Sequence, residues 1–182
     1  GDISIRNILQ MNSGVSLLGR ADNRKFTHKS RGIGDFNGMA DVREALNFYI
    51  KPARKEASGM NYHASDSLAL SILVEDVAGK SLAEYFYENI YINFGKFNFM
   101  TWTSDKNGTT NSFSDLVMTA RDWANFGKYI MDQQKTNTCL GKFFNEGIEN
   151  SIPSGNSNGS RYGFHSWVFS IRGEPTMVLQ GH

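Results

Sequence analysis

The pattern of apolar and polar residues predicts a chain that is helical over most of its length. In the first segment, Ser4 is placed to cap a helix whose apolar residues lie on one side, and Gly14 is expected to end it. Gly79 is expected to end a later helix, because glycine tolerates the left-handed conformation found just past helix ends. Capping residues predict the other helix starts: Asp41 with Glu44, Ser65 or Asp66, Ser81 with Glu84, and Thr119.

The pattern becomes strand-like only near the end of the chain. Residues 133–160 are rich in Asn, Gly and Ser and are expected to be partly irregular. The stretches "RYGFHSWVFSI" and "TMVLQ", separated by "RGEP", then predict a hairpin. An isolated hairpin is marginal in water and needs more strands or a covering layer, and no strand is evident before residue 160.

These patterns together predict an α/β (α+β) fold, with a helical region beside an antiparallel sheet. Residues 1–160 are expected to form its mainly helical part, and residues 161–182 two strands of the sheet. Because the other strands are not evident, we expect the chain to be one domain that is incomplete at both ends.

Composition narrows the function classes. Nineteen Lys and Arg oppose 18 Asp and Glu, with no run of like charge, so nucleic acid and membrane surfaces are not expected partners. No apolar stretch has the length of a membrane span. A single cysteine, Cys139, excludes an internal disulfide, and the four histidines lack metal-ligand spacing, with His28 expected in a loop and His165 in a strand. No metal and no cofactor are therefore expected.

Four segments of the chain stand out as possible motifs: "ISIRNILQMNSGV", "SGMNYHASDSLALSILVEDVAGKSLAEYFYENIY", "TWTSDKNGTTNSFSDLVMTARDWANFGKYIMD", and "RYGFHSWV" with the terminal "QGH". In register and in order, they resemble motifs of serine hydrolases of the β-lactamase and penicillin-binding-protein group. The nearest branch contains class C β-lactamases, esterases and 6-aminohexanoate-dimer hydrolases. The resemblance implies a β-lactamase/transpeptidase-like fold. It also implies hydrolysis of a small-molecule ester, amide or lactam through a serine acyl-enzyme, without a metal.

The resemblance assigns two residues of this chain to a site. Tyr62 takes the position of the tyrosine in the family's Y-x-N or Y-x-S motif, which helps to move the proton. His182 matches the histidine of an H-x-G strand that lines the site and helps to hold the substrate. Ala64 stands where the family has Asn or Ser, so the amide or hydroxyl of that position is missing. The alternatives are a packing aromatic for Tyr62 and a strand-end residue for His182.

The family's nucleophile motif, S-x-x-K, does not occur in these 182 residues. In the family it precedes the segment that "ISIRNILQ" resembles, so we expect it upstream of Gly1 and expect the chain alone to be inactive. "GNSNG", residues 155–159, satisfies G-x-S-x-G, but that motif is meaningful only where a strand turns into a helix. We expect a polar loop there, and Ser157 is not the expected nucleophile. "TSDKNG", residues 103–108, is expected to be a turn.

Several interpretations of function stay open at this point. Within enzymes, the alternative is a D-alanyl-D-alanine carboxypeptidase-like protein or a β-lactamase. Outside enzymes, the alternatives are a non-catalytic relative that binds a ligand or partner, favoured by Ala64, and an unrelated helical interaction module. The substrate is not determined, because one framework serves many chemistries. Periplasmic or secreted location is common in this group but not general.

Overall fold

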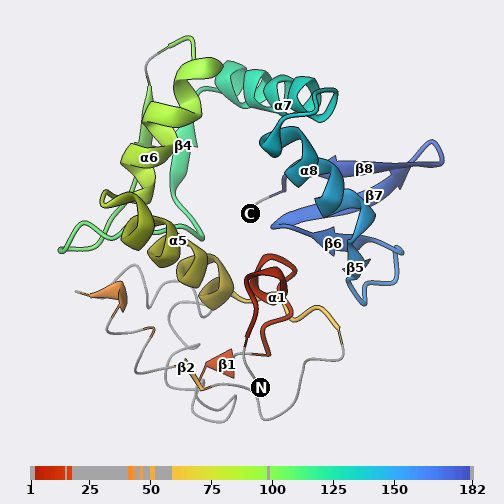
Figure 1. Cartoon of the computed structure of the whole chain (residues 1–182), viewed down its shortest axis with the longest axis horizontal. Coiled ribbons are helices and arrows are strands. Elements are labelled where there is room, and N and C mark those ends of the chain that lie inside the picture. Colours follow the sequence, from red (N-terminus) through yellow and green to blue (C-terminus); the bar gives the residue numbers. More distant parts are fainter. Residues whose placement is uncertain are drawn as a thin grey trace. The chain divides into compact units, whose positions relative to one another are not determined.

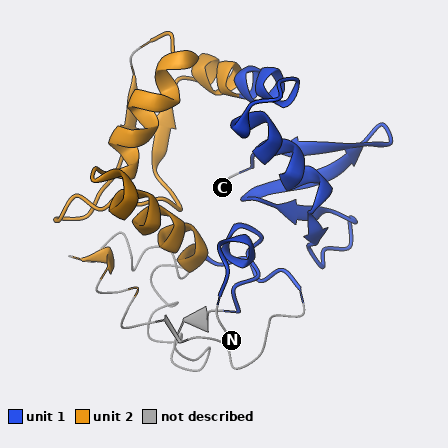
Figure 2. Cartoon of the chain, in the orientation of Figure 1, with its two compact units in different colours: residues 1–14, 53–63, 127–182 blue, residues 15–52, 64–126 orange. Residues whose placement is uncertain are grey.

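The computed structural model describes residues 3–14, 59–97 and 99–180, together with residues 16–17, 41–43, 46 and 50–51 (Figure 1). The chain forms two compact units, which Figure 2 distinguishes by colour. Unit 1 contains Gly1–Gly14, Ala53–His63 and Gly127–His182, and unit 2 contains Val15–Pro52 and Ala64–Phe126. The prediction that residues 1–160 and 161–182 are parts of one domain stays a prediction.

Unit 1 is built on a four-stranded antiparallel sheet of order β5-β6-β7-β8. Its strands are β5 (Ile152–Pro153), β6 (Arg161–Gly163), β7 (Ser166–Ile171) and β8 (Glu174–Val178). The predicted pair of strands after residue 160 is therefore wrong in number, because residues 164–165 form a tight turn that divides the first of them. The first strand of this sheet, β5, lies before residue 160, where no strand was evident from the sequence.

Helix α8 (Cys139–Glu149) packs on this sheet and was not predicted (Figure 1). Thr138 caps it by accepting a hydrogen bond from the Gly141 N–H at 3.1 Å. The backbones of α8 and β6 approach closely, since a methyl group on Gly163 would overlap the carbonyl oxygen of Gly147. Glycine at position 163 is therefore a condition for this helix–sheet packing.

Helix α1 (Ile5–Leu9) is short and is tied to the sheet of unit 1 by a backbone hydrogen bond. Ser4 and Asn7 form a capping box, which confirms the predicted start. The helix ends at Leu9 rather than continuing to Gly14, and Met11 has a left-handed φ of 51°. The His165 N–H donates to the Leu9 carbonyl at 2.8 Å, so the end of α1 is attached to the turn between β6 and β7.

Unit 2 combines helices with two small antiparallel sheets of two strands each. Its described elements are β1 (Ser16–Leu17), β2 (Ile50–Lys51), α5 (Ala64–Ala78), α6 (Leu82–Asn89), η1 (Tyr91–Asn93), β3 (Met100–Trp102), β4 (Leu116–Met118) and the first part of α7 (Ala120–Gln134). β1 pairs with β2 and β3 with β4, both antiparallel. No helix among the described residues is long and apolar enough to cross a membrane.

Most of the helix signals of unit 2 are confirmed. Ser81 and Glu84 form the predicted capping box of α6, and the Thr119 hydroxyl accepts from the Asp122 N–H at 3.1 Å at the start of α7. Gly79 ends α5 with φ of 67°. The predicted cap of α5 is wrong, because the helix begins at Ala64 and both candidates lie inside its first turn. The helix that Asp41 and Glu44 were expected to start falls largely outside the described residues.

The stretch "TARD", residues 119–122, ends in a buried carboxylate, Asp122. Its side chain is fully buried and accepts hydrogen bonds from the Tyr91 hydroxyl and the Lys96 N–H, both at 2.9 Å. A buried carboxylate is tolerated only where such donors replace water. The residue therefore fastens the loop after α6 to the first turn of α7.

The predicted turn at 103–108 is also confirmed, with Asp105 accepting from the backbone N–H groups of Asn107 and Thr109.

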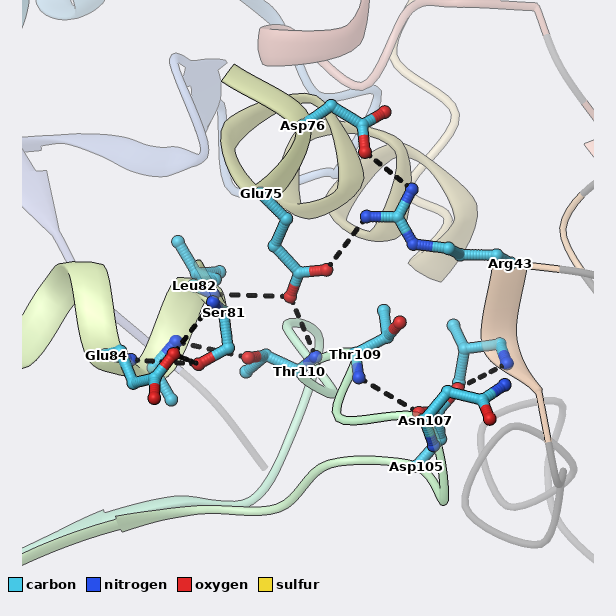
Figure 3. A network of polar contacts seen from close by, with 12 residues as sticks. Arg43, Glu75, Asp76, Ser81, Leu82, Glu84, Asp105, Asn107, Thr109 and Thr110 are labelled. Atoms are coloured by element: carbon cyan, nitrogen blue, oxygen red, sulfur yellow. Dashed lines mark hydrogen bonds and ion pairs between the residues drawn. The ribbon is translucent and has the colours of Figure 1, made fainter. Parts of the chain in front are cut away.

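A second buried carboxylate, Glu75, joins three segments of unit 2 (Figure 3). One oxygen accepts from the backbone N–H of Leu82 at 3.2 Å and of Thr110 at 2.9 Å. The other oxygen pairs with the Arg43 guanidinium at 3.1 Å. The Glu75 side chain is only 7% exposed. Arg43 also pairs with Asp76 at 2.7 Å, but the Asp76 side chain is 60% exposed. Two carboxylates thus share one arginine, but Glu75 is buried and also accepts from two backbone N–H groups.

We expect Glu75→Ala to lower the free energy of unfolding by about 3 kcal/mol, because it leaves buried donors unpaired. The matched control is Asp76→Ala, for which the loss of an exposed pair is expected to be below about 1 kcal/mol. Urea unfolding of both variants measures the difference. Equal losses of unfolding free energy in the two variants would contradict the conclusion that Glu75, rather than Asp76, joins the three segments.

Candidate active site

Tyr62 lies in unit 1 against two aromatic residues of the sheet. Its ring stacks on Trp167 of β7 with centroids 5.8 Å apart and an interplanar angle of 20°. The Tyr162 ring of β6 meets Tyr62 edge-on at 5.7 Å and meets Trp167 edge-on at 5.2 Å. Each ring therefore contacts the other two, in the offset and edge-to-face arrangements that aromatic quadrupoles favour.

The sheet register explains why these rings meet. Tyr162 and Trp167 are directly opposite each other in the β6–β7 pair, so their side chains project from the same face. The segment of Tyr62 is held beside them, because the Asn61 N–H donates to the Met11 carbonyl at 2.7 Å. Tyr62 itself lies two residues before α5, which agrees with its predicted place ahead of a helix.

The Tyr62 phenol is partly covered and chemically neutral at pH 7. The residue remains 57% exposed, although its ring is stacked. Burial raises the pKa of Tyr62 above its ordinary value, because desolvation disfavours the phenolate. In this setting the hydroxyl is a hydrogen-bond donor and a proton donor. It becomes a proton acceptor only beside a positive charge that stabilises the phenolate.

The other residues of the motif have plainer positions. His63 is half-buried, and desolvation lowers its pKa, so its imidazole is neutral at pH 7. Ala64 is the first residue of α5, and its methyl group offers no hydrogen bond. His182 lies outside the described residues. The site roles of Tyr62 and His182 therefore stay predictions.

The turn that leads from Tyr162 to Trp167 has an unusual backbone. Phe164 and His165 have φ of 47° and 60°, the left-handed pair that a two-residue hairpin turn requires and that usually contains Asn or Gly. Tertiary contacts hold it: the Phe164 ring packs on Phe143 at 5.0 Å and under the Arg6 guanidinium at 5.3 Å. His165, predicted as a strand residue, is thus a turn residue.

The turn residue His165 predicts a pH-dependent stability. Burial lowers its pKa to about 4, against the opposing effect of a hydrogen bond with the Ile8 backbone. The unfolded state then binds a proton near pH 6.5, which the folded state does not bind until about pH 4. As far as His165 is concerned, the free energy of unfolding therefore has its full value above pH 6.5 and decreases as the pH falls to 4. Each pKa unit is worth about 1.4 kcal/mol, so roughly 3 kcal/mol is lost in this window.

The measurement is the free energy of urea unfolding at several pH values between 4 and 7. His165→Asn is expected to flatten this part of the pH profile, since Asn tolerates a positive φ but does not titrate. His63→Asn is the matched control and leaves His165 in place. A pH profile that is the same in His165→Asn and in the unmodified chain would contradict the prediction.

The apparent G-x-S-x-G motif is not at a nucleophile position. Ser157 is exposed in the loop between β5 and β6, and no strand-to-helix turn occurs there. This confirms the prediction of a polar loop. The sequence pattern did not predict the two aromatic partners of Tyr62, which are Tyr162 and Trp167. From its pattern alone, Trp167 is expected to be a packing residue. The available signal was the aromatic repetition within "RYGFHSW".

Comparison with solved structures shows the fold. The chain is similar to a Bacillus anthracis protein assigned as a 6-aminohexanoate-dimer hydrolase, with TM-score 0.64, 17% identity, and coverage of 92% of this chain and 52% of that one. It is similar to the D-amino acid amidase of Ochrobactrum anthropi SV3, with TM-score 0.62, 15% identity, and coverage of 96% and 62%. It is also similar to a penicillin-binding protein of Bacillus halodurans, with TM-score 0.58, 15% identity, and coverage of 95% and 60%.

The fold is therefore that of the β-lactamase/transpeptidase-like proteins, as the sequence resemblance implied. The hydrolase, amidase and penicillin-binding-protein descriptions that the sequence suggested match those of the similar structures. The chain spans between 52% and 62% of the length of these three structures. No protein-family model matches the chain, and no curated protein matches it in sequence.

Proposed function

We propose that the intact protein is a serine hydrolase that cleaves an amide or ester bond through an acyl-enzyme, with Tyr62 as a proton-transfer residue. The observation that carries the proposal is the clamped position of Tyr62 in a fold shared with amidases. Its ring is held by two side chains of the sheet while more than half of the residue stays exposed. A rigid phenol that remains accessible is what proton transfer to a bound substrate requires.

In the proposed mechanism, a serine from an S-x-x-K motif outside these residues attacks the carbonyl carbon. A serine hydroxyl needs a base for this step, and the motif lysine is the candidate. The neutral Tyr62 phenol would donate its proton to the leaving nitrogen or oxygen as the acyl-enzyme forms. The phenolate so formed is stabilised by the lysine ammonium and regains a proton from it, which restores both groups. His182 is proposed to hold the substrate.

Amides are the substrates that the comparisons favour. The amidase from Ochrobactrum anthropi was solved with D-phenylalanine, and a D-stereospecific amidohydrolase from Streptomyces is a further similar structure, with TM-score 0.63 and 13% identity. Esters are chemically easier and are proposed as second substrates. A D-alanyl-D-alanine carboxypeptidase or a β-lactamase is the remaining enzyme hypothesis, supported by the likeness to a penicillin-binding protein.

The test is covalent trapping in the intact protein. A fluorophosphonate probe and a β-lactam are each expected to add one acyl or phosphonyl group to a serine followed at the third position by lysine, as located by peptide mass spectrometry. The same protein is expected to hydrolyse amino-acid p-nitroanilides. A folded intact protein that gives no adduct and no turnover would overturn the proposal.

One observation favours a second function. Ala64 occupies the motif position where the family has Asn or Ser, so one polar contact to substrate is missing. If the trapping experiment fails, binding of the same amides without turnover, measured by calorimetry, becomes the expected activity.

A further inference from the structure

We propose that Trp167 is the positioning residue of Tyr62, and that it sets the direction of the Tyr62 hydroxyl from the sheet side. The role in catalysis rests on the proposed function, whereas the positioning itself does not. Its basis is one geometric fact: the two rings are nearly parallel, with an interplanar angle of 20° and centroids 5.8 Å apart. Neither the sequence pattern nor the family resemblance assigns a role to Trp167.

Trp167 is well suited to hold another ring because it is itself held. It lies on β7, which pairs with β6 on one side and β8 on the other. Its partner across one ladder is the buried Tyr162, whose ring meets it edge-on at 5.2 Å, and its partner across the other ladder is Val178. Phe169, the next residue on the same face, contacts it at 6.3 Å. The indole is therefore part of a packed layer.

Tyr62 has the opposite character, because it lies on a connecting segment and is 57% exposed. A tyrosine with an unhindered side chain occupies several staggered χ1 rotamers, which place the hydroxyl several ångströms apart. The stacked indole and the edge of Tyr162 leave only one of these directions with full aromatic contact. Placement errors of about 1 Å can lower a rate by about 100-fold, so the stack matters for proton transfer.

The first test is spectroscopic and uses the intact chain. In the unmodified protein, the ring ¹H and ¹³C signals of Tyr62, assigned by their loss in Tyr62→Phe, are expected to be shifted upfield by the ring current of Trp167. The shift is expected to disappear in Trp167→Leu and to persist in part in Trp167→Phe. Phe169→Leu is the matched control, because it alters the same face of β7 next to Trp167, and the Tyr62 signals are expected to stay where they are.

The second test measures turnover in the same variants. Trp167→Leu is expected to lower kcat about 10- to 100-fold with little change in KM, whereas Trp167→Phe retains most of the activity. Phe169→Leu is expected to keep kcat within about threefold of the unmodified protein. A general loss of stability would affect the variants at both positions. A lower kcat in Trp167→Leu but not in Phe169→Leu therefore indicates that Trp167 positions Tyr62.

The outcomes separate this inference from the proposed function. If Tyr62→Phe is inactive while Trp167→Leu keeps its kcat and the Tyr62 ring shift, the positioning role is overturned and the function stands. If Tyr62→Phe is fully active, the proposed catalytic role of Tyr62 is wrong. The ring-current shift of the Tyr62 signals then decides by itself whether Trp167 positions Tyr62. If Trp167→Leu does not fold, the ring shift in the unmodified protein and in Trp167→Phe decides it. An unshifted Tyr62 ring in the unmodified protein would overturn the inference.

Discussion

Replacing Tyr62 by phenylalanine in the intact protein is expected to lower kcat/KM by about 100- to 10,000-fold, the range that positioned general acids and bases supply. The substitution removes only the hydroxyl, so the ring can keep its stack on Trp167 and its edge contact with Tyr162. Stability should therefore change little, and the loss should fall on the acylation step. Stopped-flow measurement of acyl-enzyme formation with a chromogenic amide distinguishes this step from deacylation.

Tyr85→Phe is the matched control for this experiment. Tyr85 lies on α6, is 38% exposed, and loses the same single oxygen atom in the substitution. Its variant is expected to retain full activity. Retained acylation in Tyr62→Phe would contradict the proton-transfer role and would favour the interpretation of Tyr62 as a packing aromatic.

The second large effect is expected at Gly163, where alanine should destabilise the protein by about 4 kcal/mol or more. The added methyl group would overlap the Gly147 carbonyl oxygen and come within 3.0 Å of the Ser151 side chain. Backbone atoms of a packed helix cannot move aside cheaply, so α8 would have to separate from β6. The displacement would reach Tyr162, the neighbour of Gly163 on β6, and through it the site of Tyr62.

Gly127→Ala is the control for a glycine in an open environment. Gly127 lies inside α7, and nothing lies within 4 Å of the position of an added Cβ. The substitution is expected to stabilise the protein by about 0.5–1 kcal/mol through helix propensity. Urea unfolding followed by tryptophan fluorescence measures both variants. A Gly163→Ala variant as stable as the unmodified chain would show that α8 does not need this close approach.

Helix starts were the most predictable part of the fold, because a cap is a local interaction. Ser4, Ser81 and Thr119 each accept a hydrogen bond from a backbone N–H three residues later, and this geometry is encoded in a few neighbouring residues. The start of α5 was predicted two or three residues late for the same reason. Both Ser65 and Asp66 are capping types, and local sequence does not decide between a cap and a first-turn position.

Helix α8 was missed although its pattern was present. Thr138 is a good cap, and Leu140, Phe143, Phe144 and Ile148 recur with helical spacing. The surrounding Asn, Gly and Ser residues are typical of loops, so residues 133–160 were expected to be partly irregular. Two glycines within this region, Gly141 and Gly147, weaken the intrinsic helix propensity, and both are explained by close packing of neighbouring backbone or side-chain atoms.

The candidate site divides in a similar way between local and non-local information. A motif resemblance predicts a site role for Tyr62, which stays a prediction, and the fold that the resemblance implied is confirmed by the solved structures. The partners of Tyr62 come from positions 100 or more residues away in the chain. Their contact depends on a left-handed turn at Phe164 and His165, and this conformation is uncommon for a bulky residue such as Phe164.

The sequence by itself determined the caps of α1, α6 and α7, the place of Tyr62 ahead of a helix, and the order of motifs that matches this fold, because these are properties of residues close together in the chain. Only the tertiary structure decided the division of "RYGFHSWVFSI" into two strands, the packing of α8 on Gly163, and the stack of Tyr62 on Trp167. The turn at Phe164 and His165 is unfavourable locally and is held by α1, Phe143 and Arg6. Its conformation follows from the sum of distant contacts, which a short stretch of sequence does not contain.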